Sequence, residues 1–104
     1  MSILSITFHT TENRIQDWDE YMENELHQMI ENLIDVDKYI LSDVYSEMIN
    51  EGKNTNLFLW FDSDRLRNEF MENEMLNIEE IILQKFGSEV MIFPTFLDPK
   101  KKRF

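Results

Sequence analysis

The chain has 104 residues, a formal net charge of −11, and 42% hydrophobic and 12% aromatic residues. This composition is typical of a folded protein, and the length suits a single domain. The chain contains no cysteine, which excludes disulfides, thiol catalysis and cysteine-bound zinc and fits a reducing cytoplasm. The negative charge argues against binding to nucleic acid. Because no apolar run could span a membrane and residues 1–10 lack the features of an export signal, we expect a cytoplasmic protein outside the membrane.

The first expected elements are a strand over residues 2–10 and a long amphipathic helix after it. Apolar and polar residues alternate in the strand, as they do in a half-buried strand. Thr10 or Thr11 is a suitable helix cap, and Glu12 suits the positive end of a helix. Along the helix, apolar residues recur at a helical spacing, which predicts one buried stripe. The stripe comprises Ile15, Trp18, Met22, Leu26, Met29 and Leu33.

The rest of the chain has the pattern of a hairpin, a second helix and a last strand. Residues 38–49 and 56–61 are expected to pair around a turn at Gly52. Asp62 or Ser63 can cap a helix over about residues 64–86, and Gly87 suits a left-handed helix stop. In the last strand, residues 89–97, Pro94 cannot donate to a central ladder, so this strand is expected at a sheet edge.

The element order βαββαβ predicts an α+β fold of the ferredoxin-like class. Right-handed crossovers would place four antiparallel strands in the spatial order 4-1-3-2, with two helices on one face. The helices are expected to cover the face that carries Leu4, Ile6, Phe8, Leu57, Leu59 and Phe61.

The other face of this sheet would have no cover from the chain itself. Such a patch would exceed what soluble monomers usually expose, so we predict a homodimer packed sheet to sheet as an α+β barrel, with the same patch on both subunits. The alternative is a monomer with an open sheet, because protein surfaces commonly carry scattered apolar residues. The candidates for the dimer interface, or for a cavity within it, are Ile3, His9, Tyr39, Leu41, Tyr45, Phe58, Trp60, Met91 and Phe93.

Two segments carry a family resemblance. They are DWDEYM at residues 17–22 and KFGSEVMIFPTFL at residues 85–97, and within them the matching residues are Trp18, Met22, Phe86, Gly87 and Phe93. On these residues the chain resembles an uncharacterised bacterial family, the domain of unknown function 4286, over nearly its whole length. The family often has His-Ile-Pro soon after the methionine, whereas this chain has Glu25, Leu26 and His27. The resemblance implies a dimeric α+β barrel and no known activity.

Few residues are arranged for chemistry, and we assign no catalytic residue, metal or cofactor. The glycines at positions 52 and 87 do not form a phosphate-binding loop. Glu23 and His27 lie one helical turn apart and could bind a metal, but a solvated helix face commonly shows such residues. His9 could act as an acid or base in a cavity on the uncovered face. The simpler interpretation is a strand-end residue that reaches solvent or a neighbouring carbonyl.

Residues 1–97 are expected to form the single domain, and residues 98–104 a basic tail. The run Lys100, Lys101, Lys102 and Arg103 contrasts with the excess of acids in the rest of the chain. The tail could be disordered and solubilising, or it could lie on the acidic helices of its own dimer. A third interpretation, binding to nucleic acid, is opposed by the electric field of the acidic body.

Three functions are compatible with these patterns. The leading hypothesis is a non-catalytic homodimer that binds a small molecule or a protein partner, because a fold alone confers no reaction. The alternative is a cofactor-independent enzyme of the dimeric α+β barrel type, such as a small monooxygenase or isomerase, with its site between the two sheets. The third is regulation or scaffolding through the exposed acidic helices.

Overall fold

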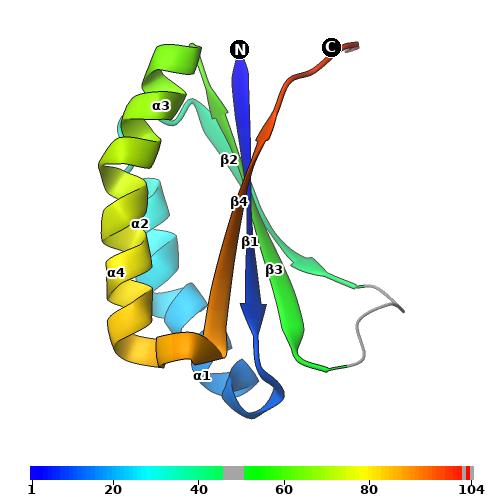
Figure 1. Cartoon of the computed structure of the whole chain (residues 1–104), viewed down its shortest axis with the longest axis vertical. Helices are drawn as coiled ribbons and strands as arrows, with labels where there is room; N and C mark the ends of the chain where they lie inside the picture. Colours follow the sequence, from blue (N-terminus) through cyan, green and yellow to red (C-terminus); the bar gives the residue numbers. More distant parts are fainter. Residues whose placement is uncertain (46–50, 102, 104) are drawn as a thin grey trace.

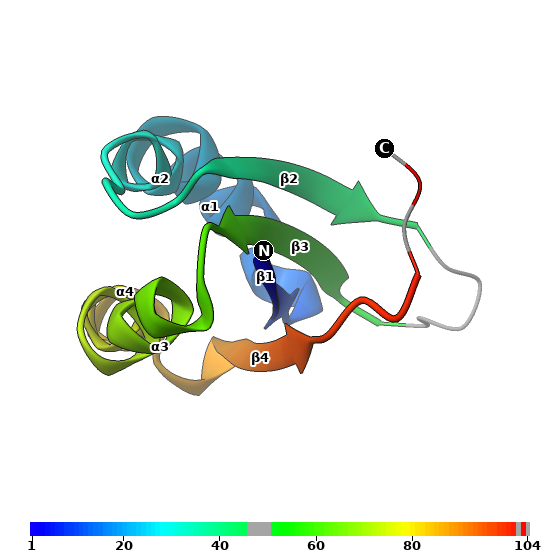
Figure 2. The same ribbon diagram turned by 90° about the horizontal axis from the view of Figure 1, so that it is seen from above.

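The chain folds into one antiparallel sheet with all of its helices on one side (Figures 1 and 2). The computed structural model describes residues 1–45, 51–101 and 103. The strands are β1 (Ser2–Thr10), β2 (Lys38–Val44), β3 (Lys53–Phe61) and β4 (Val90–Leu97), in the order β2-β3-β1-β4. The predicted ferredoxin-like fold, its strand order and the edge position of the strand with Pro94 are confirmed.

The first helical segment is continuous but changes its hydrogen-bonding pattern along its length. It comprises the 3₁₀ turn η1 (Glu12–Arg14), α1 (Ile15–Tyr21), the π-helical η2 (Met22–Leu26) and α2 (His27–Glu31). In the π segment the N–H of His27 donates to the carbonyl of Met22, which adds one residue to the turn. The extra residue rotates α2 about the helix axis, so Ile30 is buried although the predicted stripe lacks it. Tyr21, just before the π segment, is also buried and also absent from the predicted stripe.

The second helical segment is broken where one helix was predicted. It comprises α3 (Asp64–Glu72) and α4 (Glu74–Phe86), separated by Asn73 with φ −122° and ψ −76°. The predicted cap is confirmed at Ser63, whose hydroxyl accepts a hydrogen bond of 3.2 Å from the N–H of Leu66. The short 3₁₀ turn η3 (Gly87–Glu89) then leads into β4.

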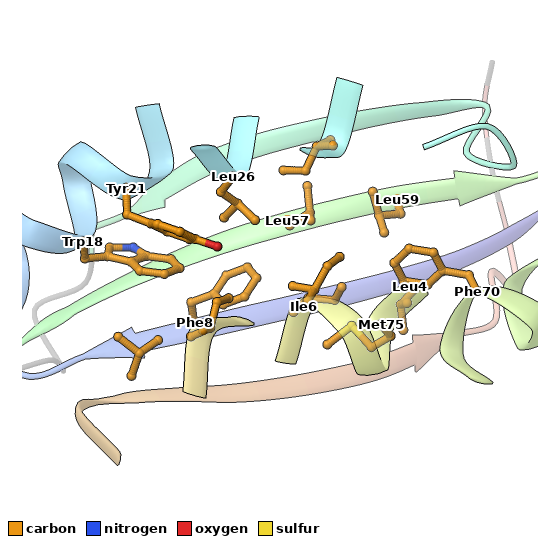
Figure 3. Packing of buried hydrophobic residues seen from close by; sticks show 14 of the residues in the cluster. Leu4, Ile6, Phe8, Trp18, Tyr21, Leu26, Leu57, Leu59, Phe70 and Met75 are labelled. Atoms are coloured by element: carbon orange, nitrogen blue, oxygen red, sulfur yellow. The ribbon is translucent and has the colours of Figure 1, made fainter. Parts of the chain in front are cut away.

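The core lies between the helices and one face of the sheet (Figure 3). Leu4, Ile6 and Phe8 of β1 are fully buried there, and so are Leu57 and Leu59 of β3. This confirms which face of the two central strands the helices cover. At one end, the ring of Trp18 packs 5.2 Å from that of Phe8 and 5.6 Å from that of Phe86, centroid to centroid. Burial of these aromatic rings helps to stabilise both helical segments against the sheet.

The two faces of β2 point in the opposite directions to those predicted. Tyr39 pairs with Leu59 and Leu41 pairs with Leu57, so both lie on the helix face and pack against the core. Placing these two on the uncovered face was therefore wrong. Ile40 and Val44 lie on the uncovered face instead. The predicted continuation of this strand over residues 46–49 lies outside the described residues.

Two glycines have the backbone geometry expected at turns. Gly52 has φ +81° just before β3, and Gly87 has φ +60° directly after α4. A Cβ at Gly52 would lie 2.3 Å from the carbonyl oxygen of Thr10, whereas one at Gly87 would meet no atom within 4 Å. The hairpin is thus closely packed against the end of β1. In the described residues, no helix combines the length and apolar character that a membrane span requires.

Candidate functional site: the open face of the sheet

The face of the sheet away from the helices, here called the open face, is the candidate functional surface. The strand register arranges its side chains in four rows that each cross from β2 to β4. From the first row to the fourth, the residues are Lys38, Trp60, Ile3 and Leu97; Ile40, Phe58, Ser5 and Thr95; Ser42, Asn56, Thr7 and Phe93; and Val44, Asn54, His9 and Met91.

The open face differs from the rest of the molecule in its charge. Charged residues make up 30% of the chain, yet Lys38 is the only lysine, arginine, aspartate or glutamate in the four described rows. Large apolar side chains here are solvent-exposed, with exposed fractions of 54% for Ile40, 45% for Met91 and 51% for Phe93. A face that is partly apolar and has one charged side chain in its described rows, on a strongly acidic protein, is suited to contact with another surface of low charge.

The aromatic end of the open face is formed by Phe58 and Trp60. Their ring centroids are 4.7 Å apart, and the ammonium nitrogen of Lys38 lies 5.6 Å from the centre of the Trp60 ring. The indole nitrogen of Trp60 is buried, and no described residue accepts a hydrogen bond from it. A buried donor without a partner is costly.

The centre of the open face is polar and neutral. The side-chain amide of Asn56 donates to the hydroxyl of Ser5 at 2.8 Å and, more weakly, to that of Thr7 at 3.4 Å. In the fourth row, Nδ1 of His9 lies 2.6 Å from the side-chain oxygen of Asn54. Because that oxygen can only accept, Nδ1 is the donor in this contact. The contact holds the imidazole in one orientation.

The predicted candidates are only partly brought together. Ile3, His9, Phe58, Trp60, Met91 and Phe93 share the open face, whereas Tyr39 and Leu41 lie on the helix face and Tyr45 follows β2 with 89% of its surface exposed. Sequence analysis missed Ile40, Asn54 and Asn56. The alternation along β3 could have revealed the two asparagines, because they lie on the same face of this strand as Phe58 and Trp60.

A hollow of about 370 Å³ lies between the π segment and the edge strand β2. Its lining comprises Met22, Glu23, His27, Tyr39, Leu41, Ser42 and Asp43. The Tyr39 hydroxyl donates to the Glu31 carboxylate, which raises the pKa of Tyr39 above its ordinary value. The Nε2 atom of His27 lies 3.4 Å from a carboxylate oxygen of Glu31. Within the described residues, no group of three or more possible ligands is arranged to hold a metal ion.

A comparison with known protein families gives a match over most of the chain. A family model described as a domain of unknown function, DUF4286, matches residues 1–100. No curated protein matches the sequence.

Several solved structures have the same fold at low sequence identity. A dimeric ferredoxin-like protein from an uncultured marine organism has a TM-score of 0.68 and 13% identity, over 100% of this chain and 99% of that one. HapK from Hahella chejuensis has a TM-score of 0.67 and 9% identity, over 100% and 97% of the two chains. An ethyl tert-butyl ether d (ethd) family protein from Bacillus halodurans has a TM-score of 0.67 and 13% identity, over 91% and 97%. These similarities are of fold.

Proposed function

We propose that this chain, which belongs to the family of domains of unknown function DUF4286, acts as a homodimer whose two open faces pack against each other and hold a small ligand or partner segment between them. One observation carries the proposal. The open face exposes large apolar side chains and has Lys38 as its only fully charged residue among the described rows. The ferredoxin-like neighbours described as dimeric support the same assembly.

A second copy is the occupant that suits this face best. A twofold interface is built from the same patch on both subunits, so the patch must be compatible with itself. A neutral patch meets this condition, whereas the acidic helices would repel their own copies. The neutral side chains of Ser5, Thr7 and Asn56 would find partners on the facing sheet or on an enclosed ligand.

The assembly is tested by a pair of phenylalanines on the same strand. Phe93 lies on the open face with 51% of its surface exposed, and Phe96 lies on the helix side with 52% exposed. We expect Phe93→Asp to be a monomer in sedimentation velocity at micromolar concentration, because a buried unpaired carboxylate opposes association. Phe96→Asp should remain a dimer. If the unmodified protein sediments as a monomer, or if both variants remain dimers, the proposed assembly is wrong.

The binding role is non-catalytic in our proposal, and the centre of the open face is where a ligand would lie. Native mass spectrometry of the purified dimer would show any bound small molecule. Replacing His9 with alanine should reduce the bound fraction if the ligand contacts the oriented imidazole. A dimer whose facing sheets bind nothing in an unbiased metabolite screen would reject the ligand-binding role and leave the assembly standing. We also propose a cytoplasmic location, which a chain without cysteine fits.

A second candidate is a cofactor-independent enzyme with its site between the two sheets. The contact of 2.6 Å between His9 and Asn54 favours it, because it holds through one ring nitrogen a side chain that can act as an acid or base. Chemical change of a co-purified compound on incubation, abolished by His9→Ala and retained by Phe96→Asp, would identify catalysis. Binding without chemical change would support the non-catalytic role.

A further inference from the structure

The hollow between the first helical segment and β2 is separate from the open face. Figure 2 shows this helical segment beside the edge strand β2, and the hollow of about 370 Å³ lies between the two. Tyr39 and Leu41 line it from the helix face of the sheet, which is the face away from the proposed dimer. The volume is within the range of small-molecule sites. A ligand in this hollow would therefore bind independently of the dimer and of any ligand between the two sheets.

The hollow has an apolar part to which each of its two walls contributes. Met22 of the π segment and Leu41 of β2 both line the hollow, and both pack against the core. Because the core holds them, these side chains present a ligand with a fixed apolar contact. The wall that carries Met22 is the π turn itself, Met22–Leu26, and such turns occur frequently at functional sites.

The charged side chains of the hollow are mainly acidic. Glu23 lines it from the helical segment and Asp43 lines it from β2. Among the residues that the structure describes, no ion pair includes Glu23. His27 also lines the hollow, but its Nε2 atom lies 3.4 Å from a carboxylate oxygen of Glu31, so any positive charge on the imidazole is already matched. The lining therefore favours a cation over an anion.

Lys53 shows that an ammonium group can be held between these two walls. Its nitrogen lies 2.8 Å from Asp19 in the helical segment and 3.2 Å from Asp43 in β2. Burial acts to lower the pKa of Lys53, but the hydrogen bonds to the two carboxylates outweigh it and raise the pKa. Glu23 follows Asp19 by four residues, so the two lie on neighbouring turns of the helical segment. Glu23 thus provides a further carboxylate on the same wall, for which the described residues supply no ammonium.

We propose that this hollow binds a small linear aliphatic amine in its protonated form. The ammonium lies between Glu23 and Asp43, in the same manner as the ammonium of Lys53. The alkyl chain lies along Met22 and Leu41. Hydrogen bonds between an ammonium and a carboxylate are about twice as strong as those between neutral groups, so the charged end fixes the orientation of the ligand. A metal ion fits less well, because the described residues contain no group of three or more ligands arranged for one.

The test titrates pentylamine into the isotope-labelled protein in a low-salt buffer and follows the NMR shifts of the backbone amides. We expect saturable shifts at the residues that line the hollow and none at Phe58 and Thr95 of the open face. Pentanol has the same chain without the charge, and it should bind at least about tenfold more weakly. Ethylamine has the charge and a shorter chain. Its affinity should be lower by up to about fourfold for each missing methylene that the hollow would cover.

Glu23→Gln tests the site directly, because it keeps the shape of an exposed side chain and removes its charge. We expect it to raise the dissociation constant of pentylamine about tenfold. Glu72→Gln is the matched control. It makes the same change in net charge on the exposed surface of α3 and should change the constant by less than about twofold.

Three results would refute the site. The first is an absence of saturable binding to the unmodified protein. The second is equal weakening by Glu23→Gln and Glu72→Gln, which would show only a general attraction of cations to an acidic protein. The third is a set of shifts confined to the open face, which would place the amine in the site between the sheets instead. None of these results bears on the assembly of the dimer, which sedimentation tests separately.

Discussion

The indole N–H of Trp18 donates to the hydroxyl of Thr55 at 3.1 Å, and both side chains are fully buried. The bond joins the first helical segment to the central strand β3, across the core. It satisfies two polar groups that water cannot reach, in a region otherwise built from aromatic rings. The position of the helix over the sheet is therefore specified by a directional contact as well as by burial.

Thr55→Val should destabilise the protein by about 1–3 kcal/mol, because it keeps the shape of the side chain but leaves the indole N–H buried without an acceptor. Urea denaturation at fixed protein concentration measures the change. Ser88→Ala is the control, since it removes a hydroxyl from an exposed residue away from the open face and should change stability by less than about 0.5 kcal/mol. Equal stability of the Thr55 variant and the unmodified protein would show that the bond contributes nothing.

Lys53 joins the first helical segment to the hairpin by contacts with two carboxylates. Its ammonium nitrogen lies 2.8 Å from Asp19 of α1 and 3.2 Å from Asp43 of β2. Burial acts to lower the pKa of Lys53, but the hydrogen bonds to these carboxylates outweigh it and raise the pKa above 10.5. Lys53→Met should cost about 1 kcal/mol at pH 7. Arg65→Met, which removes an exposed pair with Glu69, should cost less.

The Lys53 contribution should depend on pH in the alkaline range. A raised folded-state pKa means that the stabilisation is complete below the unfolded value of 10.5 and is lost as pH rises through the folded value. The difference in unfolding free energy between the unmodified protein and Lys53→Met should therefore shrink above about pH 10.5. Urea titrations at pH 8 and pH 11 measure it. A difference that grows with pH would contradict the assignment.

Gly52→Ala should be more destabilising than Gly87→Ala. Both glycines have positive φ, so each substitution carries a conformational cost of about 1–2 kcal/mol. At Gly52 the added Cβ would also lie 2.3 Å from the carbonyl oxygen of Thr10 and 3.0 Å from the ring of His9, whereas Gly87 has open space. Thermal unfolding of the two variants compares them directly. A larger loss at Gly87 would show that the hairpin adjusts without cost.

Glu74→Gln should raise the stability at pH 7. Burial, followed by the charge of Asp35, raises the pKa of Glu74 above its ordinary value of 4.5, so the ionised carboxylate opposes folding. The penalty is complete above the raised pKa and disappears as pH falls below 4.5. We expect a gain of less than about 1 kcal/mol at pH 7 that vanishes at pH 4. Glu72→Gln, at an exposed neighbour, should show no such pH-dependent gain.

Much of the fold could be predicted from the sequence because local signals and burial agree. The alternation in β1 and β3 assigned their faces correctly, and Pro94 and Ser63 had the roles expected of an edge-strand proline and a helix cap. Helix continuity was harder to predict. The π turn at Met22–Leu26 and the break at Asn73 depend on how each segment fits the sheet, and neither has a proline or glycine to mark it.

The site was harder to predict than the fold, and the error in β2 shows why. The two faces of β2 were separated correctly, but which one met the helices depends on register. A long connection between β2 and β3 leaves register open, unlike a two-residue turn. Tyr39 was predicted to lie on the uncovered face with the other aromatic residues. It lies on the helix face instead, where its hydroxyl donates to the carboxylate of Glu31. Which face of a strand meets the helices is thus set by contacts between segments that are distant in the sequence.

In the proposed dimer, the separation of charge between the two sides of the sheet would also limit the size of the assembly. A pair of subunits that encloses both neutral faces presents charged helices and loops to every further copy. Each pair carries twice the negative charge of one chain, so pairs repel one another in solution. Growth of the paired protein into filaments or amorphous aggregates is thereby opposed, and a concentrated solution should stay clear and contain a closed two-subunit particle.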